Sequence, residues 1–543
     1  MRLTEIVAVG LQVAGTVAQL GPRRSLPWLQ KDSSLRLHKR DAPDPSDLYP
    51  AHTLSVPVDH FHNSSLYEPH SSETFPLRYW FDTTYYKPGG PVIVLSAGET
   101  SGTGRLPYLQ KGIVAQLSKV TGGIGVILEH RYYGESFPVP DLSTENLRFL
   151  TTEQALADTA YFAEHVQFPG IEEKVNPPYK PWIAYGGSYA GGFVAILRVL
   201  YPDTFWGAIA SSGVTAAIYD YWEYHEPIRK YGPKDCIANA VDFVKVIDHV
   251  LLGSDEPAKQ ELKKIFGMSG IEHSGDFATV LAYGVWGWQG RNWDPAINDG
   301  SFAEYCGNVT ADSILYPDTA SLKPAVAKLA SSADVSPKIV TPLLNLIGYT
   351  QISTLAPCAS SERTQEQCFG TYNSTYYAQD SLDDDWRAWP YQYCTQWGYI
   401  QTGSGVPEHI PPLVSRTLDL EYLTIVCREA FGITGPPDVD AINKYGGYEI
   451  AAERLAFVDG EADPWRPVTP GADGAPWREN TLERPWWKIP GGVHHWDENG
   501  VFKNETGPGV PSKDVRWSQE YEAKFVKEWI WEWKGCCKKE GWC

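Results

Sequence analysis

The stretch that decides the fold is Trp182-Ile-Ala-Tyr-Gly-Gly-Ser-Tyr-Ala-Gly-Gly192. Its apolar start predicts a short buried strand, and the residues that follow the glycines predict a helix over 193–200. Ser188 stands between them, with Gly186 two residues before it and Ala190, where the general pattern has glycine, two residues after it. A serine on a sharp strand-to-helix turn needs small neighbours because the turn strains the backbone. The stretch therefore predicts an exposed nucleophilic serine. The competing interpretation is a glycine-rich turn in which the serine has no chemical role.

Runs of the same kind surround this stretch. The other strand-like runs in the first part of the chain are Leu77–Phe81, Pro91–Ser96, Gly125–Glu129 and Gly207–Ser211. A helix is predicted over Thr152–Val166, with Thr152 as its cap. Strands that alternate with helices favour an α/β fold with a mainly parallel sheet.

The pattern changes between residues 215 and 440, which are richer in helical and loop signals and hold six of the nine cysteines. Strand-like runs return at Arg454–Val458 and Trp486–Ile489. We therefore predict an α/β-hydrolase core with a parallel-type sheet, split by an inserted, mainly helical cap domain. The expected division is 41–214 and 441–535 for the two parts of the core, 215–440 for the cap and 536–543 for a cysteine-rich tail.

The same fold predicts where the partners of Ser188 lie. A serine hydroxyl is a poor nucleophile and needs a general base that a carboxylate orients. In α/β-hydrolases the chain order is serine, then an acid, then histidine. The histidine pair 494–495 follows the last predicted strand, and Asp463 lies in the loop after the strand before it. Asp459 and Glu461 are alternatives for the acid.

Several segments together resemble the prolyl carboxypeptidase and dipeptidyl peptidase II family of serine peptidases, including its secreted fungal members. They are Glu129-His-Arg-Tyr-Tyr-Gly-Glu-Ser136, Leu150–Asp158, Gly186–Tyr189, Ala208–Ser212, Asp459-Gly-Glu-Ala-Asp-Pro-Trp465 and Gly492–His495. The resemblance runs from about Thr74 to Trp531 and is weaker in parts of the inserted region. It implies the same core and helical cap that the residue pattern predicts.

The resemblance also implies a reaction. Ser188 matches the nucleophile of the family, Asp463 the acid and His494, the first of the pair, the base. They would act in an acyl transfer that needs no cofactor and no metal. The family typically cleaves next to proline, so proline-containing peptides or proteins are the expected substrates. We expect an exopeptidase, either a Pro-Xaa carboxypeptidase or a dipeptidyl peptidase.

Three alternatives stay open. A proline-specific endopeptidase would use the same catalytic residues. A lipase or esterase would share the fold, although the oxyanion segment typical of lipases is absent. A non-catalytic binding protein with a decayed site is the third.

Further site residues follow from the same reasoning. The backbone N–H groups of Tyr189 and Gly98 are the expected donors to an oxyanion. Trp465 is the candidate wall of a proline pocket, and its alternative role is to pack the acid loop. Glu99 is the candidate partner for a charged substrate terminus, and its alternative is an ordinary surface or structural carboxylate. We interpret the pair His130-Arg131 as structural.

Two departures from the family pattern matter. The family often reads His-His-Leu-Asp-Leu-Arg after the last strand, whereas this chain reads His494-His-Trp-Asp-Glu-Asn499. A relay through the second histidine and that arginine therefore does not carry over. Asp459 stands where asparagine is usual in the family.

The cysteines point to disulfide bonds. Spacing and resemblance together imply the pairs Cys236–Cys306, Cys358–Cys368 and Cys394–Cys427, although the sequence alone does not fix the connectivity. The other three are Cys536, Cys537 and Cys543, and the odd total leaves at least one thiol unpaired. No C-x-x-C pair is present, which argues against a zinc site, and we expect no metal.

The N-terminal residues predict secretion. Arg2 and the apolar stretch Ile6–Val17 predict a signal peptide over 1–18, and Lys39-Arg40 predicts a propeptide over 19–40. The alternatives are a buried N-terminal helix and an ordinary basic pair. Four N-x-[ST] sequons, at Asn63, Asn308, Asn373 and Asn504, fit a secreted glycoprotein with disulfide bonds.

Charge and hydropathy exclude other classes. Lys and Arg number 46 and Asp and Glu 66, for a net charge of −20, which argues against nucleic-acid binding. No apolar run reaches the roughly 18–20 residues of a membrane span. We expect peptide substrates, no nucleic acid and no membrane span, with a homodimer as one possible assembly. The isoelectric point near 5.1 and the resemblance prompt the hypothesis of an acidic pH optimum.

Overall fold

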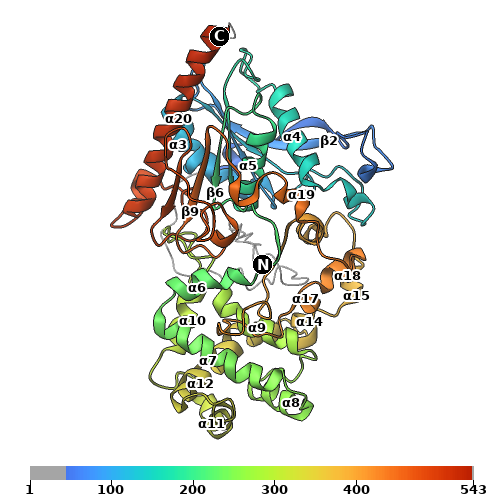
Figure 1. The fold of residues 1–543 in the computed structure, drawn as a ribbon, viewed down its shortest axis with the longest axis vertical. Coiled ribbons are helices and arrows are strands. Elements are labelled where there is room, and N and C mark those ends of the chain that lie inside the picture. The colour runs from blue at the N-terminus through green and yellow to red at the C-terminus, as the bar shows by residue number, and fades with distance from the viewer. Residues whose placement is uncertain (1–43, 541–543) are drawn as a thin grey trace, which may run out of the picture.

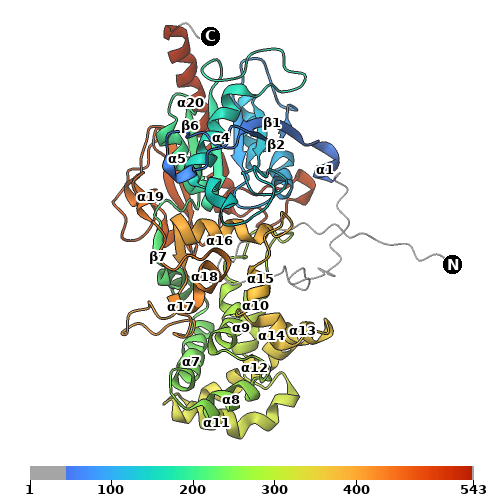
Figure 2. The same ribbon diagram turned by 90° about the vertical axis from the view of Figure 1, so that its right-hand side faces the viewer.

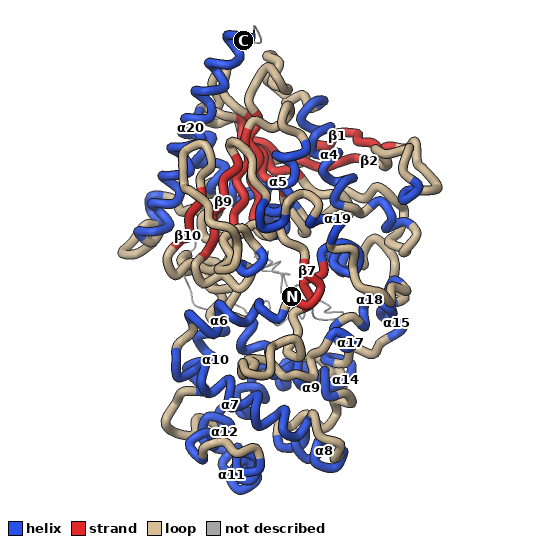
Figure 3. The backbone as a smooth tube through the Cα atoms, viewed as in Figure 1, coloured by secondary structure: helices blue, strands red, loops and turns tan. Residues whose placement is uncertain are grey.

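An eight-stranded sheet forms the core (Figures 1 and 3). The computed structural model describes residues 44–540, so the predicted signal peptide and propeptide and residues 541–543 lie outside the described residues. The strands are β1 (His52–Pro57), β2 (Thr74–Asp82), β3 (Val92–Ser96), β4 (Ile124–Leu128), β5 (Trp182–Gly187), β6 (Gly207–Ser211), β9 (Leu455–Gly460) and β10 (Trp486–Ile489). Their order is β1-β2-β4-β3-β5-β6-β9-β10. β1 and β2 pair antiparallel to their neighbours, and all pairings from β4 to β10 are parallel.

The sheet confirms the predicted α/β core with its mainly parallel strands. β6 and β9 are neighbours in the sheet, with Ala208 opposite Leu455, although more than 240 positions separate them in the chain. The residues between them therefore form an insertion in one continuous sheet. β1 was not predicted, because only Val56 of this edge strand is buried and its apolar pattern is weak.

Helices cover both faces of the sheet. α4 (Thr152–His165) and α5 (Tyr189–Leu200) pack on one face, with Val92 and Val94 of β3. α3 (Ile113–Thr121) and the long C-terminal α20 (Lys513–Glu540) pack on the other, with Ile93 and Leu95 (Figures 1 and 2). Because successive side chains of a strand point to opposite faces, a strand buried on both sides reads as a continuous apolar run.

The start of one helix and the cap of another differ from the sequence prediction. α5 begins at Tyr189, directly after the serine, rather than at Phe193. The cap of α4 is Thr151, whose hydroxyl accepts the backbone N–H of Gln154 at 3.3 Å, so Thr152 is the first helical residue.

The inserted region is mainly helical, as predicted, and forms the lower half of the molecule in Figure 1. Its helices are α6 (Glu226–Tyr231), α7 (Lys234–Leu251), α8 (Glu256–Ile265), α9 (Ser274–Trp286), α10 (Ser301–Val309), α11 (Lys323–Ser332), α12 (Val340–Thr350), α13 (Ala356–Ser360), α14 (Gln365–Phe369), α15 (Ser374–Tyr377), α16 (Ala388–Gln392), α17 (Leu420–Leu423), α18 (Ile425–Phe431) and α19 (Asp440–Asn443). Two short parallel strands, β7 (Ile218–Asp220) and β8 (Gly398–Ile400), pair the start of this region with the segment after α16. Among residues 44–540, no helix has both the length and the hydropathy to cross a bilayer.

Three disulfide bonds lie in the inserted region. Cys236–Cys306 joins α7 to α10, Cys358–Cys368 joins α13 to α14, and Cys394–Cys427 ties the segment after α16 to α18. These are the pairs that spacing and resemblance implied. At the C-terminus, Cys536 has an exposed free thiol and Cys537 is disulfide-bonded. Both belong to α20, so the predicted tail starts as the end of a helix rather than as a separate segment.

Candidate active site

The turn between β5 and α5 holds Ser188 in a strained conformation, with φ 61° and ψ −126°. Its backbone N–H donates to the Ser211 carbonyl at 2.9 Å, and its carbonyl accepts from the N–H groups of Gly191 and Gly192. A Cβ at position 186 would overlap the carbonyl oxygen of Ala190, so only glycine fits there. This geometry presents the serine side chain at the carboxyl end of the sheet, as a nucleophile elbow does.

The structure brings three sequence-predicted residues into hydrogen-bond contact. His494 Nε2 lies 2.8 Å from Ser188 Oγ, and His494 Nδ1 lies 3.0 and 2.9 Å from the two carboxylate oxygens of Asp463. A carboxylate on Nδ1 favours the tautomer whose Nε2 can accept the serine proton. The arrangement can therefore perform nucleophilic catalysis with a serine, a base and an orienting acid.

Burial and the contact between Asp463 and His494 both shift the pKa values of the acid and the base. Burial lowers the pKa of His494, although the Asp463 carboxylate acts in the opposite direction. Burial opposes ionisation of Asp463, but attraction to His494 and the hydrogen bonds it accepts outweigh it and lower the pKa of that carboxyl group. The two shifts favour a neutral imidazole and an ionised carboxylate, which are the states that a general base and its orienting acid require.

The two alternatives for the acid lie elsewhere. Asp459 is the fifth residue of β9 and is buried. Glu461 accepts the backbone N–H of Gly491 at 3.0 Å. Of these three acidic residues, Asp463 is the one with a hydrogen bond to His494.

The two expected oxyanion donors lie at the elbow. Tyr189 is the first residue of α5, so its backbone N–H has no acceptor inside the helix. Gly98, just after β3, has φ 72°, and a Cβ there would lie 3.3 Å from the Cβ of Ala190. The loop after β3 therefore lies against the first turn of α5, where an oxyanion on an acylated serine would need its donors.

Trp465 lies beside the catalytic histidine. Its ring centroid is 6.2 Å from that of His494, its backbone N–H donates to Asp463 at 2.9 Å, and its indole N–H donates to Gln289 at 2.9 Å. The ring is 4% exposed. These contacts favour a packing role for most of the indole and leave little of it to line a pocket.

Sequence reasoning missed the aromatic residues that the inserted region contributes around the site. Trp389 and Trp397 make edge contacts with Tyr189 at 5.3 and 5.2 Å, and Tyr399 and Tyr221 lie 5.3 and 5.5 Å from Trp465. No motif marks them, because they lie far from Ser188 in the chain. The unexplained aromatic excess, 21 tryptophans among 543 residues, was the available signal.

Glu99 and Arg105 follow β3 on the same side of the site. The charge of Glu99 acts on the guanidinium of Arg105 and on the hydroxyl of Tyr189. Arg105 Nε donates to the Ala97 carbonyl at 3.2 Å. A carboxylate and a guanidinium thus lie in the loop and helix that follow β3, and both are half-buried rather than on the open surface.

His495 pairs with an acid rather than with the arginine of the family pattern. Its Nδ1 lies 3.1 Å from Glu498, and its backbone N–H donates to Ser212 at 2.9 Å. Burial opposes the charged form, but the Glu498 carboxylate outweighs it and raises the pKa of His495. Asn499, in the place of the family arginine, donates instead to Asp294 at 3.1 Å.

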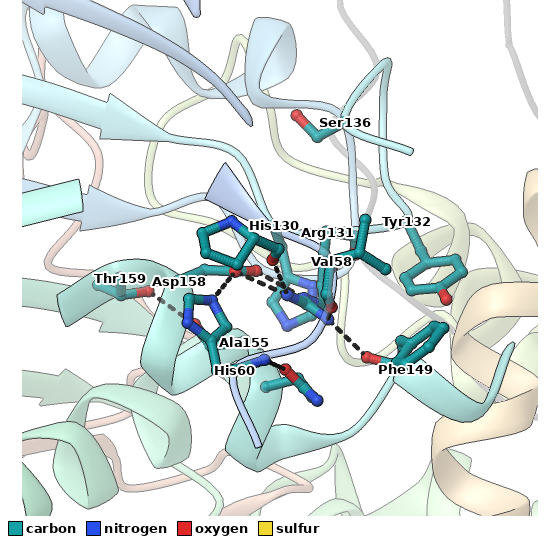
Figure 4. A network of polar contacts seen from close by, with 12 residues as sticks. Val58, His60, His130, Arg131, Tyr132, Ser136, Phe149, Ala155, Asp158 and Thr159 are labelled. Atoms are coloured by element: carbon teal, nitrogen blue, oxygen red, sulfur yellow. Dashed lines mark hydrogen bonds and ion pairs between the residues drawn. The ribbon is translucent and has the colours of Figure 1, made fainter. Parts of the chain in front are cut away.

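His130 and Arg131 are both buried (Figure 4). Arg131 forms an ion pair with Asp158 and donates to the carbonyls of Val58 and Phe149 at 3.1 and 2.9 Å. His130 Nε2 lies 3.0 Å from the Tyr189 hydroxyl, and burial lowers its pKa to about 4. Their contacts are those of a structural network behind the elbow.

The four sequons differ in exposure. Asn63, Asn373 and Asn504 are exposed, whereas Asn308 is half-buried on α10, where its amide nitrogen donates to the Glu304 carbonyl at 2.8 Å. The atom to which a glycan would be attached is therefore already engaged in a hydrogen bond on the helix.

Known proteins show the same sequence pattern. The profile of the family described as "Serine carboxypeptidase S28" matches residues 56–276 and 325–501, which include Ser188, Asp463 and His494. A probable extracellular serine carboxypeptidase of Arthroderma benhamiae is 51% identical over 492 residues, which cover 90% of this chain and 69% of that protein. The serine protease vicPb of Bipolaris victoriae is 31% identical, over 84% of this chain and 86% of its own.

More distant relatives extend to animals. The human thymus-specific serine protease is 28% identical over 72% of this chain and 73% of its own. Among solved structures, a proline iminopeptidase of Mycobacterium smegmatis covers 89% of this chain and 99% of its own at 12% identity, with a TM-score of 0.34 that is too low to support an argument. From the profile match and the two fungal relatives, the chain belongs to the serine carboxypeptidase S28 family of serine-type peptidases.

Proposed function

We propose that this secreted serine-type peptidase is an exopeptidase that cleaves proline-containing peptides through an acyl-enzyme on Ser188. The observation that carries the proposal is the chain of contacts from Ser188 Oγ through His494 to Asp463, at 2.8 and 2.9–3.0 Å. The disulfide-bonded inserted region fits an oxidising compartment outside the cell.

In the proposed reaction, Ser188 Oγ attacks the scissile carbonyl carbon while His494 Nε2 takes the hydroxyl proton. The carbonyl electron pair moves to the oxygen, which the N–H groups of Tyr189 and Gly98 would stabilise; the loss of one such donor typically costs about 10²–10³ in rate. His494 then gives the proton to the leaving amine as the C–N bond breaks. Water, activated by the same imidazole, hydrolyses the ester. Asp463 keeps the imidazole oriented and stabilises its charged form.

The preference for proline is supported by the aromatic surroundings of the elbow. The rings of Trp389, Trp397 and Tyr399 give flat apolar surfaces near Tyr189 and Trp465. A pyrrolidine ring has no N–H to satisfy once it is acylated, so such surfaces can accept it without a buried polar partner. Glu99 could bind a free amino terminus and Arg105 a free carboxylate, which leaves both exopeptidase modes open to test.

The first experiment measures hydrolysis by the purified chain and by Ser188→Ala. We expect the variant to keep its circular dichroism spectrum and melting temperature and to lose turnover by at least about 10³-fold. Full activity in a folded Ser188→Ala variant would overturn the assignment. Turnover of a long-chain ester with no peptide cleavage would favour an esterase instead.

The second experiment fixes the mode. Mass spectrometry follows the products from one peptide with an internal proline, prepared with both ends free, with a blocked amino end, and with an amidated carboxyl end. Loss of cleavage upon amidation indicates a carboxypeptidase, and loss upon amino blocking indicates a dipeptidyl peptidase. Equal cleavage of all three would show an endopeptidase.

We also propose the domain division 41–214, 215–440 and 441–535. A homodimer is one possible assembly, and analytical ultracentrifugation of the purified chain would test it.

A further inference from the structure

The loop between β1 and β2 brings together two histidines and an aspartate. The ligand atoms of Asp59, His62 and His70 all lie within 4.8 Å of one another. Within residues 44–540, this is the one group of three or more such side chains that could hold a metal ion. Asp59 is hydrogen-bonded to Phe61, His70 and Gln154, none of which belongs to the peptidase site.

Asp59 is oriented as a metal-ligating carboxylate would be. It is 1% exposed. Its Oδ1 accepts two hydrogen bonds, from the Phe61 backbone N–H and from Gln154 Nε2, each at 2.8 Å. Its Oδ2 is directed instead at His70 Nδ1, 2.7 Å away. One oxygen is thus fixed by neighbours that would form the outer shell of a metal site, and the other faces the histidines.

The histidine side of the group is open and adjustable. His62 is exposed, and the His70 side chain is 26% exposed. The two rings lie with centroids 5.5 Å apart at an interplanar angle of 40°. The hydrogen bond from His70 gives the buried Asp59 carboxylate a partner. It does not explain why the His62 imidazole lies beside that of His70. Solvent reaches both rings, so an ion has an entry path.

A rigid scaffold holds the carboxylate in place. The neighbouring His60 donates its backbone N–H to Gln154 Oε1 at 2.9 Å, and its Nε2 lies 2.8 Å from Asp158. Arg131 donates hydrogen bonds to the Asp158 carboxylate and to the Val58 carbonyl (Figure 4). Both residues that flank Asp59 are therefore tied to α4 and to the end of β4.

We propose that Asp59, His62 and His70 bind a zinc ion, with water in the fourth position. Two imidazole nitrogens and one carboxylate oxygen are a usual zinc donor set, whereas calcium and magnesium take mainly oxygen ligands. With bonds of about 2.0–2.2 Å, two donors of a tetrahedral zinc lie roughly 3.3–3.6 Å apart. His70 Nδ1 would therefore give up its proton and move away from Asp59 Oδ2, now 2.7 Å from it, while rotation of the exposed His62 brings in the third donor. The bound ion would stabilise the position of the loop between β1 and β2 against the core. The proposal departs from the sequence-based expectation of no metal, which considered only cysteine pairs, because this donor set is made of histidine and aspartate.

The test uses the full chain, freed of metal by chelation and dialysis. Calorimetric titration with zinc at pH 7.5 measures the stoichiometry and affinity, and cobalt replaces zinc for visible spectroscopy. We expect one zinc per chain, tetrahedral cobalt bands, and a melting temperature that rises with zinc. His62→Ala should weaken zinc binding by at least about tenfold and remove both the cobalt bands and the thermal shift.

His409→Ala is the matched control, because it removes an exposed histidine of the inserted region. It should bind zinc as the parent chain does. Both variants should keep full peptidase activity, since neither residue belongs to the catalytic site. Equal zinc affinity in the parent chain and His62→Ala, or no binding by the parent chain at millimolar zinc, would overturn the proposal.

Discussion

At the scale of single residues, burial of the Asp459 carboxyl group should make the free energy of unfolding depend on pH. It is 1% exposed, and neither carboxyl oxygen has a hydrogen-bond partner among the described residues. Thr469 is near, but its hydroxyl donates to the Arg466 carbonyl. Burial, and then repulsion from Asp463, raises the pKa of Asp459 from 3.8 to about 7. Because the folded-state pKa lies above the unfolded-state value, stability present below about pH 4 is lost as the pH rises to about 7.

Asp459→Asn should remove the loss of stability that ionisation of this carboxyl group causes as the pH rises. We expect the free energy of unfolding of the variant to exceed that of the parent by about 2–4 kcal/mol at pH 8 and to equal it near pH 4. Urea denaturation at the two pH values measures the difference. Glu479→Gln, which alters an exposed carboxylate, should change neither value. A gain of the same size at both pH values would show that the carboxyl group does not ionise in this range.

His495 offers a second electrostatic test, close to the base. The charge on His495 disfavours a second charge on His494 and so helps to lower the pKa of His494. His495→Gln removes this repulsion and leaves the Glu498 carboxylate without its histidine partner, and both changes favour protonation of His494. The acid limb of kcat/KM should therefore move to higher pH, by up to about one unit.

The measurement is the pH profile of kcat/KM for a proline-containing peptide. His409→Ala provides a control for the loss of a histidine elsewhere. An unchanged acid limb in a folded His495→Gln variant would mean that the second histidine has no electrostatic influence on the base.

At the scale of elements, the elbow depends on close approach between β5 and the first turn of α5. A methyl group at position 186 would overlap the backbone carbonyl of Ala190, which cannot move without distorting the helix. We expect Gly186→Ala to cost about 1–3 kcal/mol of stability and to reduce kcat/KM far more than it raises KM. Gly300→Ala is the control, since a methyl group there meets no atom within 4 Å. Parental activity in Gly186→Ala would contradict the strained-turn interpretation.

The elements also show which parts of the structure the sequence determines locally. The parallel strands were predictable because burial on both faces makes them continuous apolar runs, such as Val92–Ser96, in which every residue is buried. β7 and β8 were not, because each has three residues and finds its partner about 180 positions away. The elbow and its partner loops were predictable for a different reason: the turn geometry restricts residue types, and the chain order of the catalytic residues is fixed by the fold.

The surroundings of the site were less predictable. Trp389 and Trp397 carry no local signature, and their placement depends on how the inserted region folds back onto α4 and α5. The partner of His495 was not assigned either, although Glu498 stands only three residues after it, because that spacing brings two side chains together only where the backbone turns. For Trp389 and Trp397, tertiary packing decides the contacts and no spacing rule encodes them.

At the scale of the whole molecule, the inserted region completes the site of the core. Trp397 donates its indole N–H to Thr152 at 3.1 Å, and Gln396 accepts the Thr152 backbone N–H at 3.0 Å, so the segment after α16 is fastened to the start of α4. Gln392 donates to the Tyr189 hydroxyl at 2.8 Å, next to the nucleophile. The Cys394–Cys427 disulfide holds this same segment, whereas Cys358–Cys368 closes a short loop between α13 and α14.

The two disulfides should therefore differ in their effect on catalysis. Replacing Cys394 and Cys427 by serine should cost about 2–4 kcal/mol of stability and lower kcat/KM by roughly 10- to 100-fold, because the segment that contacts Tyr189 and Thr152 loses its anchor. Replacing Cys358 and Cys368 should lower the melting temperature but leave kcat/KM within about twofold of the parent value. Kinetics and thermal denaturation of the two double variants at the same temperature make the comparison. Equal losses of kcat/KM in both would mean that the inserted region acts on the site as one rigid unit, and no loss in either would mean that the core alone shapes it.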